Sequence, residues 1–284
     1  MFESASDKLK QALKAWTLRM VPKDLPEKIA ASRGEGNEFG LDPFGFSADY
    51  ALTAMGPIVW LYKHYFRVDA RGTEHVPKGR VLLVANHSGQ LPIDAAMIGT
   101  AMLMEADPPR PIRSMVEKWM PTLPYVSVFM ARMGQVVGTP ENCRRLLESD
   151  EAILVFPEGA KGINKHWRDR YRLSEFGLGF MRLALETDTP IVPISVVGGE
   201  EQAPMLFDLK PMARLLRFPA FPITPTVLPI PLPSRYHIRF GEPLRFSGSP
   251  NDEDAELERK VKEVRGTIQA MIDRGLKERR RIFF

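Results

Sequence analysis

Residues 81–94 read Val-Leu-Leu-Val-Ala-Asn-His-Ser-Gly-Gln-Leu-Pro-Ile-Asp, and they join two different patterns. The apolar run 81–85 has the length and composition of a buried strand. Pro92 suits the first position of a helix, and Asp94 is a favourable acid in a first helical turn. The stretch therefore predicts a strand, a turn and a helix in succession, with His87 just past the end of the strand.

A second stretch, residues 152–159, repeats this arrangement. The run Ala-Ile-Leu-Val-Phe is followed by Pro-Glu-Gly, which places Glu158 and Gly159 just past a second strand. Sites in open α/β sheets gather outside the carboxyl ends of the strands. We therefore expect an imidazole, its orienting acid and a second carboxylate to meet in one active site.

Beyond residue 67, strand-like and helix-like runs alternate along the chain. The strand-like runs are 81–85, 112–116, 134–137, 152–156, 191–197 and 235–240, and the helix-like runs are about 93–104, 140–149 and 174–187. Such alternation predicts an α/β fold with a largely parallel central sheet flanked by helices. We expect residues 67–284 to form this domain and residues 1–66 to form an N-terminal helical segment.

Two helix-like patterns lie in that N-terminal segment. Residues 7–21 place Leu9, Leu13 and Trp16 on one side and most lysines elsewhere. A basic amphipathic helix with a tryptophan either lies in a membrane interface or packs on the core. Residues 50–66 predict a second helix, which either docks on the domain or dips toward lipid. The glycine-rich residues 33–47 between them predict a linker or loop.

The C-terminal part carries two further features. The proline-rich run 211–233 excludes a regular helix or a central strand, and it predicts an extended apolar loop. This loop either covers the core or lines an entrance for an acyl chain. Acidic residues at 251–254 and basic residues at 277–281 match the dipole of a C-terminal helix. That helix packs on the core, and its basic end is also suited to contact anionic lipid.

The bulk composition narrows the class of protein. With 284 residues, 44% of them hydrophobic and 26% charged, the chain can bury a sizeable core. No apolar run reaches the roughly 20 residues that span a bilayer, and no signal-peptide pattern is visible. The single cysteine, Cys143, favours a reducing compartment, so we expect a cytoplasmic protein. The scattered basic residues argue against a nucleic-acid partner.

His87 and Asp94 suggest general-base chemistry. A neutral imidazole can remove the proton of a substrate hydroxyl, and a carboxylate on its other nitrogen stabilises the imidazolium. On a continuous helix, residues seven apart would lie about 10 Å apart along the axis, so Gly89 must turn the chain for the two to meet. In the alternative interpretation, Asp94 is only a favourable acid at a helix start. Because no Gly-x-Ser-x-Gly motif exists, the hydroxyl is expected to be the substrate's own.

A basic stretch follows Glu158 and Gly159, beginning at Lys161 and continuing with Lys165 and three arginines. Cations beside a glycine turn can hold a phosphate or a coenzyme A tail. The alternative is a solvated loop with no such role. The sequence has no Walker loop, His-Glu-x-x-His motif or cysteine–histidine cluster, so we expect neither a metal nor a cofactor.

Four motifs in this order resemble the blocks of the glycerolipid acyltransferase superfamily, the lysophosphatidate acyltransferase-like enzymes. They are Asn86–Asp94, the fainter Gly134–Val137, Phe156–Lys161 and Ile191–Ile194, within roughly residues 67–245. The resemblance implies transfer of a fatty acyl group from acyl-CoA or acyl carrier protein to a glycerolipid hydroxyl. It also implies His87 as the base, Asp94 as its partner, and Glu158, Gly159 and Lys161 at the acceptor.

One departure from the family pattern leaves the acceptor open. Six residues separate His87 from Asp94, where the family has four. This form, with Tyr171–Phe180 and the segment 232–243, is more similar to the monoacylglycerol/diacylglycerol acyltransferase-like branch. The acceptor is thus a lysophospholipid, a neutral glyceride or another alcohol, met at the cytoplasmic face of a membrane by a peripheral enzyme. A thioesterase or lipid hydrolase, and a lipid-binding protein without turnover, are the alternatives.

Overall fold

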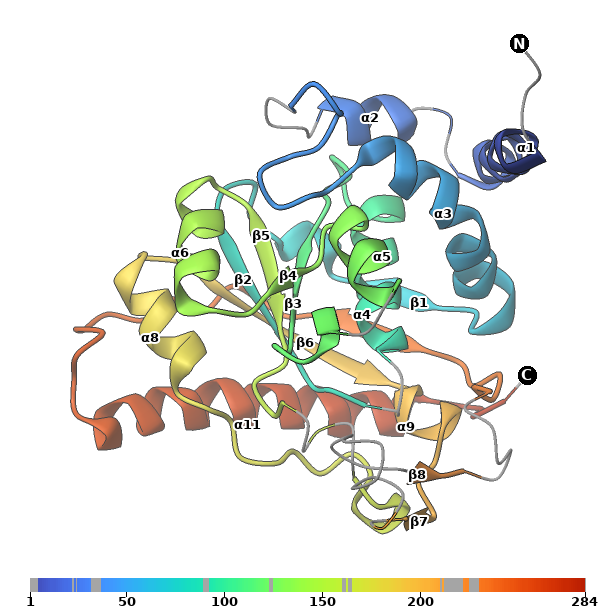
Figure 1. The fold of residues 1–284 in the computed structure, drawn as a ribbon. Coiled ribbons are helices and arrows are strands. Elements are labelled where there is room, and N and C mark those ends of the chain that lie inside the picture. Colours follow the sequence, from blue (N-terminus) through green and yellow to red (C-terminus); the bar gives the residue numbers. More distant parts are fainter. Residues whose placement is uncertain are drawn as a thin grey trace.

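A seven-stranded sheet forms the centre of the protein in its computed structural model (Figure 1). The structure describes residues 5–21, 23, 25–31, 37–88, 92–122, 125–159, 162, 165–209, 211, 222–224 and 230–283. The strands are, in spatial order, β1 (Asp69–Arg71), β9 (His237–Phe240), β6 (Ile191–Val197), β2 (Val81–Ala85), β5 (Ala152–Val155), β3 (Arg113–Val116) and β4 (Val136–Val137). Neighbouring strands are parallel except β6 and β9, which confirms the predicted α/β class.

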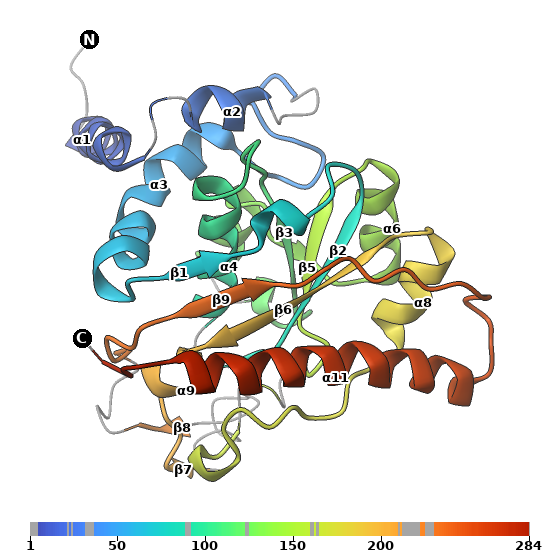
Figure 2. The same ribbon diagram turned by 180° about the vertical axis from the view of Figure 1, so that it is seen from behind.

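Helices cover both faces of this sheet (Figures 1 and 2). Successive strand residues point to opposite faces, so Leu82 and Val84 pack against α6 (Pro140–Glu148), α8 (Gly179–Glu186) and α11 (Asp254–Glu278). Val81 and Leu83 pack on the other side, against α4 (Ile93–Met104). Burial on both faces explains why β2 reads as an unbroken apolar run rather than as an alternating one.

Short elements complete the fold outside the central sheet. They are α5 (Val126–Arg132), α9 (Gly199–Gln202), the antiparallel pair β7 (Phe207–Asp208) and β8 (Pro222–Ile223), and the 3-10 turns η2 (Thr73–His75), η3 (Met120–Thr122) and η4 (Trp167–Asp169). Of these, α9 follows β6 directly and lies at the same sheet edge as the end of β2.

The N-terminal segment forms α1 (Ala5–Met20), α2 (Leu25–Ala31) and α3 (Ala48–Trp60). The first helix packs on α3, because Thr17 is buried and its hydroxyl donates to the carbonyl of Thr53 at 3.3 Å. The absence of a side chain at Gly56 allows this contact, since a Cβ there would lie 2.5 Å from Thr17 Oγ1. Leu9 and Leu18 of α1 remain exposed, so contact of this helix with lipid stays a prediction.

The predicted second helix is confirmed as α3, continued by the π-helical turn η1 (Leu61–Tyr65). Val59 lies in an N-terminal apolar cluster, whereas Tyr62 and Phe66 lie in the core beneath the sheet. This helix therefore docks on the domain and joins the two cores. The predicted division of the chain at residue 66 remains a prediction.

Residues 37–47 form a loop, as predicted, and an ion pair fastens it to the sheet. The Asp42 carboxylate accepts hydrogen bonds from the backbone N–H groups of Phe44 and Phe46. It also pairs with Arg113 of β3, which lies 3.1 Å from Glu151 and over the ring of Phe46. Arg113 and Asp42 are both about nine-tenths buried, so the N-terminal segment is tied to the sheet by a buried charge pair.

Two predicted boundaries are wrong. The helix predicted over 174–187 begins only at Gly179, because the N–H groups of Leu173, Ser174 and Gly177 bond to Gln269, Glu158 and Pro157. The strand predicted over 134–137 keeps only its last two residues. Gly134 has a φ of 87° and ends α5 instead.

Elements missed by the sequence patterns are short or polar. Strand β1 reads Asp-Ala-Arg and is held by pairing with β9, where Arg239 bonds to Asp69. The helices α2 and α5 contain only seven residues each, too few for a clear apolar period.

The C-terminal helix is confirmed as α11. Leu257, Val261, Val264, Ile268 and Ile272 form an apolar stripe of this helix and are buried. Most of the proline-rich run 211–233 lies outside the described residues, so the two interpretations of that loop stay open. None of the helices in the described part of the chain is long and apolar enough to cross a membrane.

Candidate active site

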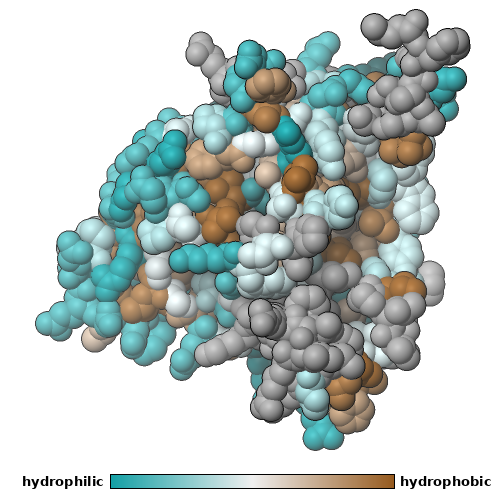
Figure 3. All heavy atoms as spheres, in the orientation of Figure 1, coloured by the Kyte–Doolittle hydropathy of each residue, from teal (hydrophilic) through white to brown (hydrophobic). Residues whose placement is uncertain are grey.

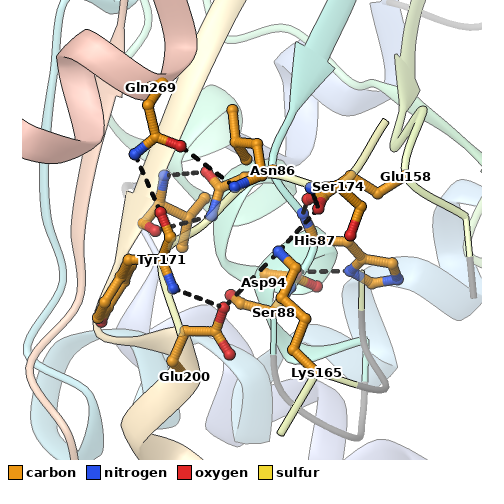
Figure 4. A network of polar contacts seen from close by, with 12 residues as sticks. Asn86, His87, Ser88, Asp94, Glu158, Lys165, Tyr171, Ser174, Glu200 and Gln269 are labelled. Atoms are coloured by element: carbon orange, nitrogen blue, oxygen red, sulfur yellow. Dashed lines mark hydrogen bonds and ion pairs between the residues drawn. The ribbon is translucent and has the colours of Figure 1, made fainter. Parts of the chain in front are cut away.

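His87 and Asp94 meet at the carboxyl end of β2 (Figure 4). His87 Nδ1 lies 2.7 Å from Asp94 Oδ2, which is the contact that the two motif residues require. Strand β2 ends at Ala85, and α4 begins at Ile93, so the two side chains come from opposite ends of one connection. The predicted pivot, Gly89, lies outside the described residues.

The carboxylate of Asp94 is buried and saturated with donors. Besides the imidazole, Oδ2 accepts the N–H of Ser88 at 2.9 Å, and Oδ1 accepts the N–H of Ala95 at 2.8 Å. These bonds fix the carboxylate at the first turn of α4, where the helix dipole favours a negative charge. The interpretation of Asp94 as only a helix-start acid is therefore incomplete, because the same carboxylate also holds His87.

The contact with Asp94 occupies Nδ1 of His87, and no described residue hydrogen-bonds to Nε2. A carboxylate oxygen accepts, so in this pair Nδ1 donates the proton and Nε2 carries the lone pair. The side chain is 14% exposed, and its ring stacks on Phe156 with centroids 4.1 Å apart. An imidazole held on two sides and open at Nε2 is suited to remove a proton.

Asn86 links the ends of β2 and β6 next to His87. Its side chain donates to the carbonyl of Val196 at 3.0 Å and accepts the N–H of the same residue at 2.7 Å. This pair extends the contact between β2 and β6 by one residue and fixes the backbone that carries His87. The sequence motif contains Asn86, but only the structure gives it this anchoring contact.

Glu158 follows the end of β5 and contacts the backbone of His87. Its side chain is buried, Oε1 accepts the N–H of His87 at 3.2 Å, and Oε2 accepts the N–H of Ser174 at 2.7 Å. The carboxylate therefore joins the loop after β2 to the segment that leads into α8. The described contacts of Glu158 are with protein groups, and a direct contact with a substrate remains a prediction.

Two glycines let the loop after β5 pass close to His87. Gly159 has a φ of 55°, a conformation that favours glycine, and its N–H closes a turn on the carbonyl of Phe156. At Gly162 a Cβ would lie 2.9 Å from His87 Cβ and 3.0 Å from Glu158 Cβ. The predicted substrate-binding role of Gly159 is untested, and Lys161 lies outside the described residues.

The sequence patterns did not distinguish Lys165 from the other basic residues of its stretch. Its side chain is 6% exposed, so it is not a solvated loop residue. The ammonium lies 2.7 Å from Glu158 Oε2 and 3.8 Å from Glu200 Oε1 (Figure 4). Only its position shortly after the Pro-Glu-Gly turn could have drawn attention to it.

A second group of buried charges adjoins the first. The hydroxyl of Tyr171 donates to Glu201, which also pairs with Arg279 at the end of α11. Tyr171 N–H donates to Glu200 at 3.3 Å. Burial raises the pKa of Glu200 to about 7, against the opposing effect of Lys165. The end of α11 is thus connected to the site through charged side chains.

Metal binding has no obvious place in this arrangement. Within the residues that the structure describes, no group of three or more His, Cys, Asp or Glu side chains is suited to hold a metal ion.

Comparison with known proteins places the chain in a family. The sequence model of the family described as Acyltransferase matches residues 67–197. An uncharacterized protein of Mycobacterium tuberculosis is 38% identical over 280 residues, covering 93% of this chain and 78% of the relative. A 1-acyl-sn-glycerol-3-phosphate acyltransferase of Limnanthes alba is 28% identical over 163 residues, covering 52% of this chain and 51% of the relative.

A solved structure has the same fold. The crystal structure of the 1-acyl-sn-glycerophosphate (LPA) acyltransferase PlsC from Thermotoga maritima aligns with a TM-score of 0.53 at 17% identity, covering 95% of this chain and 97% of that one. The family model and the relatives named as acyltransferases together define an enzyme that transfers acyl groups. The chain belongs to the acyltransferase family, within the lysophosphatidate acyltransferase-like superfamily.

Proposed function

We propose that the protein moves a fatty acyl group from acyl-CoA or acyl carrier protein to a hydroxyl of a glycerolipid, without an acyl-enzyme. The acceptor is a lysophospholipid, a monoacylglycerol or a diacylglycerol. The observation that carries this proposal is the 2.7 Å contact of His87 with Asp94 beside the buried Glu158, in a chain of this family.

In the proposed reaction, His87 Nε2 takes the proton of the acceptor hydroxyl as its oxygen attacks the thioester carbonyl. Asp94 stabilises the imidazolium that forms. The tetrahedral intermediate then collapses, the carbon–sulfur bond breaks, and the imidazolium returns its proton to the leaving thiolate. The products are an ester and a free thiol, and the step needs neither a metal nor a further cofactor.

The replacement His87→Ala tests this role. Wild-type protein is incubated with acyl-CoA or acyl carrier protein and a mixed pool of glycerolipid acceptors, and the lipids are identified by mass spectrometry. We expect the variant to lose transfer by about 100- to 10,000-fold, because general-base catalysis contributes that much. The exposed His64 provides a matched control, and His64→Ala should transfer normally.

Three other outcomes would contradict the proposal. Normal transfer by His87→Ala to every acceptor would exclude the histidine as the base. Free fatty acid without new ester would identify a thioesterase or lipid hydrolase. Lipid binding without product from any donor would identify a binding protein.

The same proposal places the enzyme on the cytoplasmic face of a membrane as a peripheral protein. Hydrophobic residues reach the surface of the face drawn in Figure 3. Exposed large apolar or aromatic side chains of α1, α3 and the start of α5 include Leu9, Leu18, Trp60, Tyr125, Val128 and Phe129. Apolar surface of this kind suits an interfacial position. Cosedimentation with phosphatidylglycerol vesicles tests it, and protein that stays in the supernatant at low and high ionic strength would contradict it.

A further inference from the structure

A buried ammonium group lies next to the candidate base without touching it. Lys165 is 6% exposed, and two carboxylates lie within 4.0 Å of its Nζ, at 2.7 Å (Glu158) and 3.8 Å (Glu200). Lysine is almost never buried unless it is paired. An ammonium group enclosed in this way is poorly placed to bind a substrate that enters and leaves the site.

Glu158 connects Lys165 to His87 through its two carboxylate oxygens. One carboxylate oxygen faces the ammonium and the N–H of Ser174, and the other accepts the N–H of His87. Both oxygens of Glu158 therefore act as acceptors at the same time, and the position of its carboxylate decides whether both contacts form.

Charge balance explains why that carboxylate needs the lysine. Glu158 and Glu200 are both buried, and the Lys165 ammonium lies within 4.0 Å of both carboxylates. Without this ammonium, the two neighbouring carboxylates repel each other. That repulsion displaces the Glu158 carboxylate from the position in which it accepts the N–H groups of His87 and Ser174.

We propose that Lys165 is a positioning residue, which fixes the imidazole of His87 for proton removal by keeping Glu158 able to hold the His87 backbone. The proposal rests on the proposed function of His87 as the general base. It assigns Lys165 no contact with donor or acceptor, in contrast to a phosphate-binding or coenzyme-binding role.

The replacement Lys165→Met should therefore lower kcat and leave KM for the acceptor within about twofold. We expect kcat to fall by about 100-fold, the effect of misplacing a catalytic group by about 1 Å. A substrate-binding lysine would instead raise KM with little change in kcat. A rise in KM at unchanged kcat would overturn the proposal.

A matched control is available in α11. The side chain of Lys260 is 11% exposed and lies 3.3 Å from Asp252 and 3.7 Å from Glu256, so it is a largely buried, paired lysine near the start of α11. Lys260→Met should lose stability without losing kcat. An equal fall of kcat in both variants would overturn the proposal, because it would reflect loss of fold alone.

A double variant guards against misfolding of Lys165→Met. In Lys165→Met/Glu200→Gln, one negative charge leaves together with the positive one, so the buried charge of the site is unchanged. We expect this protein to fold, as judged by circular dichroism, and to recover most of kcat, because Glu158 no longer faces a second buried carboxylate. A folded double variant with kcat as low as that of Lys165→Met would overturn the proposal.

Nuclear magnetic resonance of the histidine side chains separates this proposal from the proposed function. The Nδ1 proton of His87, in contact with Asp94, should give a low-field resonance that moves or broadens in Lys165→Met, returns toward its wild-type position in the double variant and stays in place in Lys260→Met. An unchanged resonance would overturn the positioning role even if transfer is observed. Absence of transfer by wild-type protein, with the resonance shifted as expected, would overturn only the proposed function.

Discussion

His87 and Asp94 are in contact although six residues separate them in the sequence. The six intervening residues do not form one continuous helix, because β2 ends at Ala85 and α4 begins at Ile93. Asp94 Oδ2 is nevertheless in contact with both the imidazole and the N–H of Ser88. The carboxylate therefore holds the histidine side chain and the backbone that follows it.

Glu200 leads to a prediction about pH at the same scale. Its pKa rises from 4.5 to about 7, first because of burial and despite Lys165 and the Tyr171 N–H, while Glu158 and Glu201 add to the rise. Between those values the folded protein holds a proton that the unfolded chain releases, so the free energy of unfolding falls as pH rises through this window. Glu200→Gln removes this dependence.

Urea unfolding at pH 5 and pH 7.5 measures the difference. Wild-type protein should lose about 2–3 kcal/mol more than Glu200→Gln between the two pH values, at about 1.4 kcal/mol for each pKa unit. The exposed Glu258 supplies the control, since Glu258→Gln should behave as wild type. Equal losses in wild type and Glu200→Gln would show that Glu200 ionises normally.

At the scale of elements, the connection from β5 to α8 also contacts residues of the site. Its backbone bonds to Glu158 and Pro157 through Ser174 and Gly177, which delays the start of α8 to Gly179. The loop also passes His87 at Gly162. The residues just before Gly179 look helical in the sequence but are not helical in the structure, because their N–H groups bond to Glu158 and Pro157 at the site.

The close passage at Gly162 predicts a loss of activity in Gly162→Ala. The new methyl group would lie 2.9 Å from His87 Cβ, so the loop or the histidine must shift. We expect kcat to fall by about 10- to 100-fold, because small displacements of a base are costly. The control is Gly266→Ala in α11, where nothing lies within 4 Å of the added methyl, and which should gain up to about 1 kcal/mol of stability. Wild-type kcat in Gly162→Ala would show that the loop yields freely.

At the scale of the whole molecule, two kinds of contact join the N-terminal segment to the sheet domain. Apolar packing runs through α3, with Val59 in one cluster and Tyr62 in the other. Charge pairing runs through Asp42 and Arg113. The segment is therefore attached as part of the fold, while its outer side chains remain exposed.

Arg113→Met tests the charged connection. It leaves Asp42 buried without its cation, and breaking a buried pair typically costs about 3–5 kcal/mol. We expect a corresponding fall in the free energy of unfolding, measured by urea denaturation. Arg259 pairs with Glu256 at the surface with 75% of its side chain exposed, so Arg259→Met should cost at most about 1 kcal/mol. A similar small loss in Arg113→Met would show that the pair contributes little to the attachment.

Much of the fold could be predicted because its central elements are locally encoded. The strands 81–85 and 191–197 and the helix 93–104 have the predicted bounds, since each is a mostly apolar run with clear ends. Strand β1 and the start of α8 could not be predicted. Both depend on partners that are distant in the sequence, Arg239 for the first and Glu158 for the second.

The sequence by itself determined the α/β class and the placement of His87 and Glu158 at the same edge of the sheet. Parallel strands with helical connections bring their carboxyl ends to one edge, so residues that follow two such strands lie at that edge. The pairing of β2 with β5, which makes these two residues neighbours, is seen only in the structure. Only the tertiary structure decided that Glu158 faces the backbone of His87 and that Lys165 is buried. The burial of a charge depends on which distant segments enclose it, and no local pattern records that.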